Sequence, residues 1–337
     1  MTEIADTDAS RAFSSLQNWI HGLVALLLIA GLTACQSDEE RVSGDEAADE
    51  TARTVVEVTA ADYAFVAPDT IPAGWVTFRM VNRGEESHHF HLDRLAEGVT
   101  VAQWREAIKE PLDSLNQLLA ENKIDSTEAR NALMKAFDRA TPDSMTELTD
   151  MHPQTHGGVG LVAPGRTGQT THHVDPGHYV MICVIRAPSG RTHAGLGMAH
   201  GLVAVDSSAG GSPPSPDVTV QGDRRKIRMD GDLSVGTQTI GFGVKDVPEG
   251  LRSGTDGYYS VWLARLADTT DISDVAAWEY TNPAPYESLG GFEYLPPNET
   301  AYLTADIEPG RYAWIWFYDG MDLLGADEPM VEAFTVE

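Results

Sequence analysis

The residues able to bind a metal ion are concentrated in the middle of the chain. Ten of the eleven histidines lie between His88 and His200, and one of the two cysteines, Cys183, lies among them. Residues 218–337 contain neither histidine nor cysteine. Because imidazole and thiolate groups are the usual protein ligands of transition metals, we expect metal chemistry only in the part of the chain before residue 207.

The segment 183–198 carries three different ligand types in succession: the thiol of Cys183, the imidazole of His193 and the thioether of Met198. Upstream, the segment 82–88 (NRGEESH) opens a second apolar run and could supply another imidazole. Two imidazoles and a thiolate in a trigonal arrangement, with a weak axial thioether, form the ligand set of blue copper sites. The sulfur atoms favour Cu(I) and the imidazoles accept Cu(II), so the sequence predicts a redox-active copper site.

Three neighbouring histidines, His88, His89 and His91, compete for the place of the second imidazole. In a strand, His88 shares one face with Phe90 and Leu92, whereas His89 and His91 share the other. Because Phe90 and Leu92 are apolar and belong in a core, we expect His88 to point inward.

The elements that position these residues are strands, and they occur twice. From residue 54 onward, short β-rich runs alternate with Pro/Gly turns, which favours an antiparallel sandwich. After the linker-like stretch SSAGGSPPSP, three blocks recur in the same order. The matching blocks are 71–74 with 233–236, 92–95 with 263–266, and 174–179 with 307–312. In the aligned second copy Tyr259 replaces His88 and Trp316 replaces Cys183, so we expect that copy to be free of metal.

These segments resemble the cupredoxin family, the plastocyanin- and azurin-like proteins. The resemblance rests on VNRGEESHHF, on the strand PGHYVMIC, and on the spacing of His193 and Met198, which follows a glycine. It implies a Greek-key β-sandwich with one copper ion in the first domain, bound by His88, Cys183, His193 and Met198. The nine residues between Cys183 and His193 form a longer gap than in the small electron carriers, and one closer to multidomain copper enzymes.

The predicted fold class is therefore mainly β: two tandem Greek-key cupredoxin-like β-sandwiches, the first with a helical insertion. The insertion spans about 100–151, where Trp104, Leu115 and Leu133 follow helical spacing and Thr100 can cap the first helix. The predicted order of segments is a lipoprotein signal peptide (1–34), an acidic tether (35–53), the first cupredoxin-like domain (54–206), a linker (207–217) and a degenerate second domain without metal ligands (218–337).

The start of the chain predicts export. The apolar run Ile20–Ala34 has the proportions of a signal-peptide core, and its ending Leu-Thr-Ala followed by Cys35 resembles the lipobox of bacterial lipoproteins. That resemblance implies cleavage before Cys35 and acylation of its sulfur and its new amine. We therefore expect an extracytoplasmic protein of the periplasm or cell envelope, anchored in a membrane by lipid, with a mild preference for the outer membrane.

The net charge and the missing motifs exclude several classes of function. With 51 acidic and 23 basic residues, the formal charge of −28 opposes binding to nucleic acid. Motifs of hydrolytic, phosphoryl-transfer and calcium-binding sites are missing from the sequence, so we expect no enzymatic activity. The expected function is electron transfer with a redox partner protein or a membrane oxidoreductase. The alternatives are a periplasmic copper-binding or storage protein and a metal-free interaction module on the same fold; the oligomeric state is left open.

Overall fold

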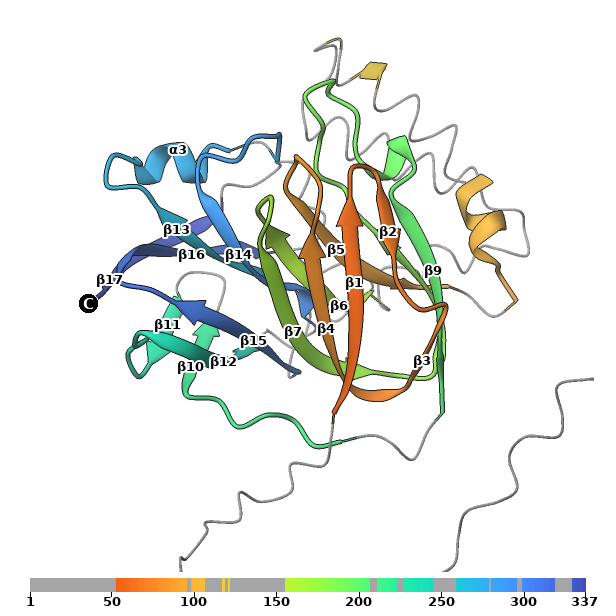
Figure 1. Cartoon of the computed structure of the whole chain (residues 1–337), viewed down its shortest axis with the longest axis horizontal. Coiled ribbons are helices and arrows are strands. Elements are labelled where there is room, and N and C mark those ends of the chain that lie inside the picture. The colour runs from red at the N-terminus through yellow and green to blue at the C-terminus, as the bar shows by residue number, and fades with distance from the viewer. Residues whose placement is uncertain are drawn as a thin grey trace, which may run out of the picture. The chain divides into compact units, whose positions relative to one another are not determined.

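A computed structural model of the chain describes residues 53–95, 98–106, 117–118, 121, 155–206, 211–222, 227–244, 259–278, 280–295, 299–318 and 329–337. All of them belong to one compact unit, Ala47–Glu337. The structure is mainly β, as the sequence predicts (Figure 1).

The strands before residue 206 form the first half of the structure. They are β1 (Thr54–Ala61), β2 (Ala64–Val66), β3 (Thr70–Pro72), β4 (Gly74–Asn82), β5 (His88–Arg94), β6 (Thr155–Val162), β7 (Thr167–Val174), β8 (Gly177–Ile182) and β9 (Ala199–Val205). Alternation of side chains explains why they form: in β1, Val56, Val58 and Ala60 are buried, while the residues between them are half-buried or exposed.

The strands after residue 217 form the second half. They are β10 (Val218–Gly222), β11 (Ile227–Asp230), β12 (Gly236–Val244), β13 (Tyr259–Leu266), β14 (Glu287–Leu295), β15 (Thr300–Ile307), β16 (Gly310–Tyr318) and β17 (Met330–Val336). One short helix, α3 (Ile272–Ala276), lies between β13 and β14, and the Asp271 side chain caps it by accepting a hydrogen bond from the Ser273 N–H.

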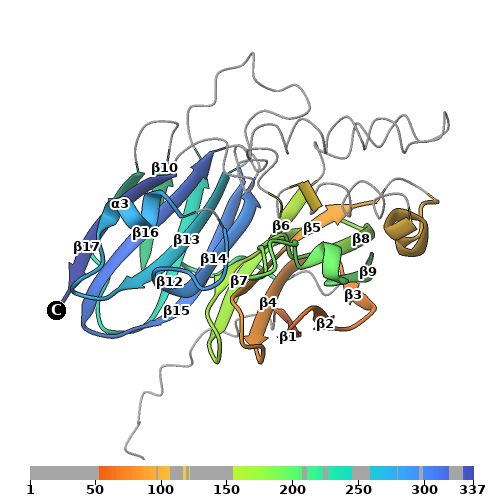
Figure 2. The same cartoon turned by 90° about the horizontal axis from the view of Figure 1, so that it is seen from above.

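Two sheets run through both halves. One sheet has the order β11-β10-β12-β15-β7-β4-β1-β2, and the other has the order β17-β16-β13-β14-β6-β5-β8-β9-β3. The halves join where β7 pairs with β15 and β6 pairs with β14, both antiparallel. Figure 2 shows β7 beside β15 at this junction. The two halves therefore share hydrogen-bonded sheets in addition to the chain that connects them.

The two halves have the same topology. β1 pairs in parallel with β4, as β10 does with β12. β4 pairs with β7 as β12 pairs with β15, and β5 lies between β6 and β8 as β13 lies between β14 and β16. The predicted duplication is confirmed at the level of strand order.

The duplication extends to irregular features. The β5–β6 ladder shifts register between His88 and Phe90, and the β13–β14 ladder shifts at the equivalent place, between Tyr259 and Val261. Gly158 and Gly291 both have positive φ, and a Cβ on either would lie about 2 Å from the carbonyl oxygen of the neighbouring strand. Only glycine fits this close approach, so both copies retain it.

The apolar cores of the halves are linked. The first core contains Val58, Phe78 and Leu92 and continues into second-half residues such as Trp262 and Phe317. The second core consists of second-half residues alone. The first half therefore packs its outer β5 side against the second half instead of against water.

The described part of the predicted insertion begins as a helix over 101–106. Thr100 and Gln103 exchange capping hydrogen bonds at its start, and Trp104 is buried in a small cluster with Leu95 and Ile182. This part covers the sandwich, as expected. The signal peptide, most of the tether, most of the insertion and the start of the linker lie outside the described residues, and the domain limits stay a prediction.

Candidate metal centre

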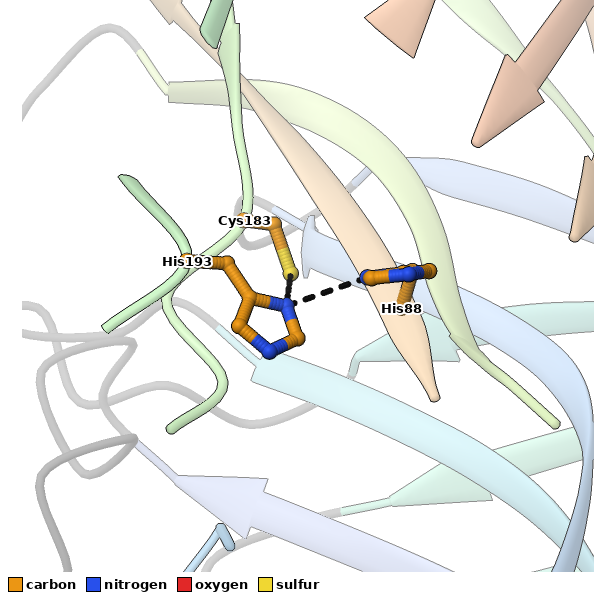
Figure 3. A group of neighbouring side chains, drawn as sticks. All are labelled: His88, Cys183 and His193. Carbon is orange, nitrogen blue, oxygen red and sulfur yellow. Dashed lines mark hydrogen bonds between the residues drawn. The ribbon is translucent and has the colours of Figure 1, made fainter. Parts of the chain in front are cut away.

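The structure brings three of the predicted ligands together. His88 begins β5, Cys183 directly follows β8, and His193 lies on the loop that leads to β9 (Figure 3). The Nδ1 atoms of His88 and His193 are 3.0 Å apart, and the Cys183 Sγ lies 3.4 Å from His193 Nδ1. One ligand atom from each residue lies within 4.8 Å of the other two, and all three residues are buried.

The loop before β5 aims His88 inward. Asn82, the last residue of β4, donates from Nδ2 to the carbonyl oxygens of Glu86 and Val162 and accepts the Gly84 N–H at Oδ1. A Cβ on Gly84 would lie 2.2 Å from the Asp62 Oδ1 atom and 2.7 Å from His88 Nε2. The Asn82 bonds and the missing side chain of Gly84 therefore shape the turn that presents the imidazole.

Backbone hydrogen bonds close the other loop around Cys183. The Ala194 N–H donates to the Cys183 carbonyl, the His193 N–H donates to the Ile185 carbonyl, and the Met198 N–H donates to the His193 carbonyl. A short 3₁₀ helix, η2 (Ala194–Leu196), fills the bend. The thiol and the imidazole are thus held on a braced loop, although nine residues separate them.

Two carboxylates hold the far side of the imidazoles. His88 Nε2 lies 2.9 Å from Asp62 Oδ1, and His193 Nε2 lies 2.9 Å from Glu86 Oε2. A carboxylate at Nε2 keeps the proton there and leaves the Nδ1 lone pair for a metal ion. Both Nδ1 atoms face the thiol, so this pattern matches the outer partners of metal-binding histidines.

The charges at the site favour a thiolate. Burial alone raises the pKa of Cys183, but the neighbouring His193 and His89 hold that pKa well below its usual value. Burial opposes the positive charge on His193, but the Cys183 charge and the Glu86 carboxylate raise the pKa of His193. A thiolate is the form of cysteine that binds metal.

The carboxylates of Asp62 and Glu86 are themselves held by hydrogen bonds. Burial opposes ionisation of Asp62, but the backbone N–H of Glu85 and the His88 side chain lower its pKa. The Tyr63 hydroxyl donates to Glu86 Oε1, and this bond raises the pKa of Tyr63 to about 12. Both acceptors of the imidazole N–H groups are therefore held in position by further hydrogen bonds, and the Asp62 carboxyl is kept ionised.

Met198, the predicted axial ligand, is buried in the same core cluster as Cys183. Its carbonyl oxygen accepts the Cys183 N–H, and its own N–H donates to His193. The backbone of Met198 thus adjoins both other loop residues, and its role as an axial ligand stays a prediction.

The donor set fits copper. One soft thiolate and two imidazole nitrogens converge, with a thioether on the same loop, and this combination suits an ion that alternates between Cu(I) and Cu(II). Among the described residues, it is the one group of three or more His, Cys, Asp or Glu side chains close enough to share an ion.

The second half fills the equivalent place with rings. The pairs Arg94–Tyr179 and Arg265–Tyr312 occupy matching registers, and counting from them puts Tyr259 at the position of His88 and Trp316 at that of Cys183. The rings of Tyr259 and Trp316 pack with centroids 5.4 Å apart, and both residues are buried. The alignment inferred from the sequence therefore agrees with the strand register.

Sequence reasoning missed the supporting residues. Asp62 and Glu86 received no role, although Glu86 lies inside the segment 82–88; its closeness to His88 was the available signal. The sequence also assigns His172 no place in the core. His172 is on the inner face of β7, buried and stacked on Phe78 at 5.2 Å, because the strand extends through it.

Comparisons with known proteins agree with this architecture. No protein-family model and no curated protein matches the sequence. Solved structures do match. A dithionite-reduced auracyanin from Roseiflexus castenholzii is 16% identical, covering 46% of this chain and 98% of its own, with a TM-score of 0.26. Auracyanin A, a blue copper protein from Chloroflexus aurantiacus, is 17% identical, covering 46% and 100%, with a TM-score of 0.26.

A longer match is the blue copper oxidase from Nitrosomonas europaea, which is 11% identical and covers 85% of each chain with a TM-score of 0.22. The fold is cupredoxin-like.

The expectation that the chain is not an enzyme is contradicted. Structures named as multicopper oxidases, which are enzymes, match 84% or 85% of the chain. The expectation failed because it rested on missing nucleophile and phosphate-binding motifs. An oxidase whose chemistry takes place on copper needs none of them, so the cupredoxin-like ligand pattern is compatible with a carrier and with an enzyme.

Cys35 and the apolar run before it lie outside the described residues, so the predicted anchor is not tested. Within the described part of the chain, no helix has the length and apolar character needed to cross a membrane. Cys183 is buried and is not part of a disulfide bond.

Proposed function

We propose that this chain is a type 1 (blue) copper protein that transfers single electrons through one site formed by His88, Cys183, His193 and Met198. The observation that carries the proposal is the convergence of two Nδ1 atoms and one Sγ within 4.8 Å, in a buried place, with both Nε2 atoms held by carboxylates. A bound copper ion would supply a one-electron couple at this place.

The chain's own residues support such a role in three ways. His88, Cys183 and His193 are all fully buried, so water is kept away from the site. The β-strands and the braced loop 183–198 fix the ligands, which lowers the cost of changing oxidation state because little has to move. Asp62 and Glu86 keep the imidazoles oriented in either state.

Redox titration of the purified protein after addition of one equivalent of Cu(II) separates electron transfer from storage. We expect an intense visible colour, because a short copper–thiolate bond is formed. We also expect that colour to be bleached by ascorbate and restored by ferricyanide over repeated cycles. A colourless protein that holds copper only as Cu(I), and is not reoxidised, would refute the electron-transfer role and fit storage.

We further propose that the protein is exported and anchored by lipid on Cys35, in the periplasm or cell envelope, where it meets a redox partner protein or a membrane oxidoreductase. The support is the apolar run Ile20–Ala34 followed by Cys35. The test is metabolic labelling with radioactive palmitate in a Gram-negative host. The native chain should be labelled and sediment with membranes, whereas Cys35→Ser should do neither; equal behaviour of both chains would refute the anchor.

A further inference from the structure

The segment 280–282 of the second half contacts the loop 183–198, which carries Cys183 and His193. The Arg186 N–H donates to the Tyr280 carbonyl, and the Asn282 N–H donates to the Arg186 carbonyl. Arg186 lies between Cys183 and His193, so these two bonds attach a loop of the metal-free half to the loop that carries two predicted ligands.

The side chain of Asn282 goes further and contacts the support of His193. Its Nδ2 donates to Glu86 Oε2 at 3.1 Å, and its Oδ1 accepts the Ser87 N–H at 2.8 Å. The same Glu86 oxygen is the partner of His193 Nε2 at 2.9 Å. Asn282 therefore fixes the carboxylate that orients one imidazole, and it also holds the residue directly before His88.

A second contact acts from the opposite face of β5. Glu293, on β14, is fully buried and accepts hydrogen bonds from Trp262 Nε1 at 2.6 Å and Ser260 Oγ at 2.8 Å. Its Oε1 also lies 3.1 Å from His89 Nδ1, while the Val184 N–H donates to His89 Nε2 at 3.1 Å. The chain of contacts runs from Glu293 through His89 to the residue directly after Cys183.

Burial makes these contacts specific. A fully buried carboxylate is destabilising unless hydrogen-bond donors surround it, and the described partners of Glu293 all lie at this junction. The equivalent position on β6 is Gly160, where a Cβ would lie 2.6 Å from the Trp262 ring. The two copies thus differ at this position in a way that lets one carboxylate from the second half reach His89 of the first.

From these contacts we infer that Asn282 and Glu293 of the second half are positioning residues of the copper site, so that the metal-free copy is a structural part of that site. The inference rests on the proposed copper-binding function. Asn282 acts through Glu86 on His193, and Glu293 acts through His89 on the backbone beside Cys183. Neither residue is placed to touch the ion.

A double-mutant cycle tests the contacts that lead from Asn282 through Glu86 to His193. The full chain and its variants are titrated with Cu(I) against a colorimetric chelator, and the Cu(II) forms are compared by visible absorption. We expect Asn282→Ala to weaken copper binding about tenfold, the lower end of the effect of losing an outer partner, and to shift the thiolate band. In a Glu86→Gln background, Asn282→Ala should change affinity less than about twofold, because the residue through which it acts is already altered.

Ser288→Ala is the matched control. The Ser288 hydroxyl is buried and donates across the same junction to the Leu161 carbonyl at 2.6 Å, without contacting the site. Its loss should leave copper affinity and the absorption band unchanged. The role of Asn282 would be overturned if Asn282→Ala had equal effects in the two backgrounds or no effect in either. It would also be overturned if Ser288→Ala had the same effect as Asn282→Ala.

Glu293→Gln keeps the shape of the side chain and tests the contacts that lead from Glu293 through His89 to the backbone beside Cys183. This test is available even if Asn282→Ala does not fold. We expect Glu293→Gln to shift the thiolate band while the protein stays folded by circular dichroism; an unshifted band in a folded protein would overturn the role of Glu293. A native chain that takes up copper without colour, or takes up none, would refute the proposed function instead, so the two failures are distinguishable.

Discussion

The two halves of the molecule place different side chains at the same point of the same scaffold. In the first half, His88 and Cys183 face His193 at the end of the sandwich. In the second half, Tyr259 and Trp316 occupy the matching register and pack ring against ring at 5.4 Å. Strand order, register shifts and the close-approach glycines agree between the halves, so the difference lies in the side chains.

This comparison acts as an internal control. The scaffold forms in the second half without histidine or cysteine, so these residues are not required by the fold. Where a metal ligand is not needed, large rings fill the space and add buried apolar area. The ligands of the first half therefore call for a functional explanation, whereas the second half packs two buried rings at that place.

The largest expected effect comes from removing the thiolate. Cys183→Ser should abolish copper-dependent visible absorption and high-affinity copper uptake, because the hydroxyl is a hard and weakly acidic replacement. The check is copper analysis after gel filtration together with the absorption spectrum. Trp316→Phe, the change at the matching position, should leave both unchanged; a blue Cys183→Ser protein would contradict the assigned site.

The second-largest effect is expected on the free energy of unfolding, and it should come from the second half, at Trp316. Trp316→Ala should lower the free energy of unfolding by about 3–5 kcal/mol, because it removes a fully buried ring. Cys183→Ala in the copper-free protein should cost only about 1 kcal/mol. Urea denaturation measures both, and a larger cost for Cys183→Ala would mean that the thiol serves packing.

A smaller effect is expected when an imidazole loses its outer partner. Asp62→Asn should weaken copper binding about tenfold, because the charge that supports His88 Nε2 is lost while the ligand remains. Chelator competition measures the affinity. Asp175→Asn is the control, since Asp175 pairs with His173 on the surface at 3.4 Å and should not change it; similar losses in both variants would argue for a general charge effect.

The smallest effect on affinity is expected at Met198. Met198→Leu should retain copper and colour, because the axial thioether is a weak ligand, but should raise the reduction potential, since a donor to Cu(II) is removed. Spectroelectrochemistry measures the potential. An unchanged potential would mean that Met198 serves packing alone.

Much of this structure could be predicted from local patterns. The duplication followed from blocks such as 92–95 and 263–266, and the inward direction of His88 followed from its alternation with Phe90 and Leu92. What could not be predicted depends on distant contacts. Asp62 meets His88 through a turn whose geometry is set by Asn82, and Glu293 meets His89 only because the second half covers that face of β5.

The exposure of the histidines shows the same limit. Alternation places His89 and His91 on the face away from the first core, yet both are buried, because residues of the second half such as Trp262 and Tyr294 pack there. A period of two predicts which face a residue lies on. It does not predict what covers that face.

The central claim is that His88, Cys183 and His193 meet on one copper ion. X-ray absorption spectroscopy at the copper edge, on protein loaded with one equivalent, tests it most directly. The account predicts a first coordination shell of one short sulfur and two imidazole nitrogens. A shell of nitrogen and oxygen atoms without that sulfur, or copper spread over several unequal sites, would contradict it.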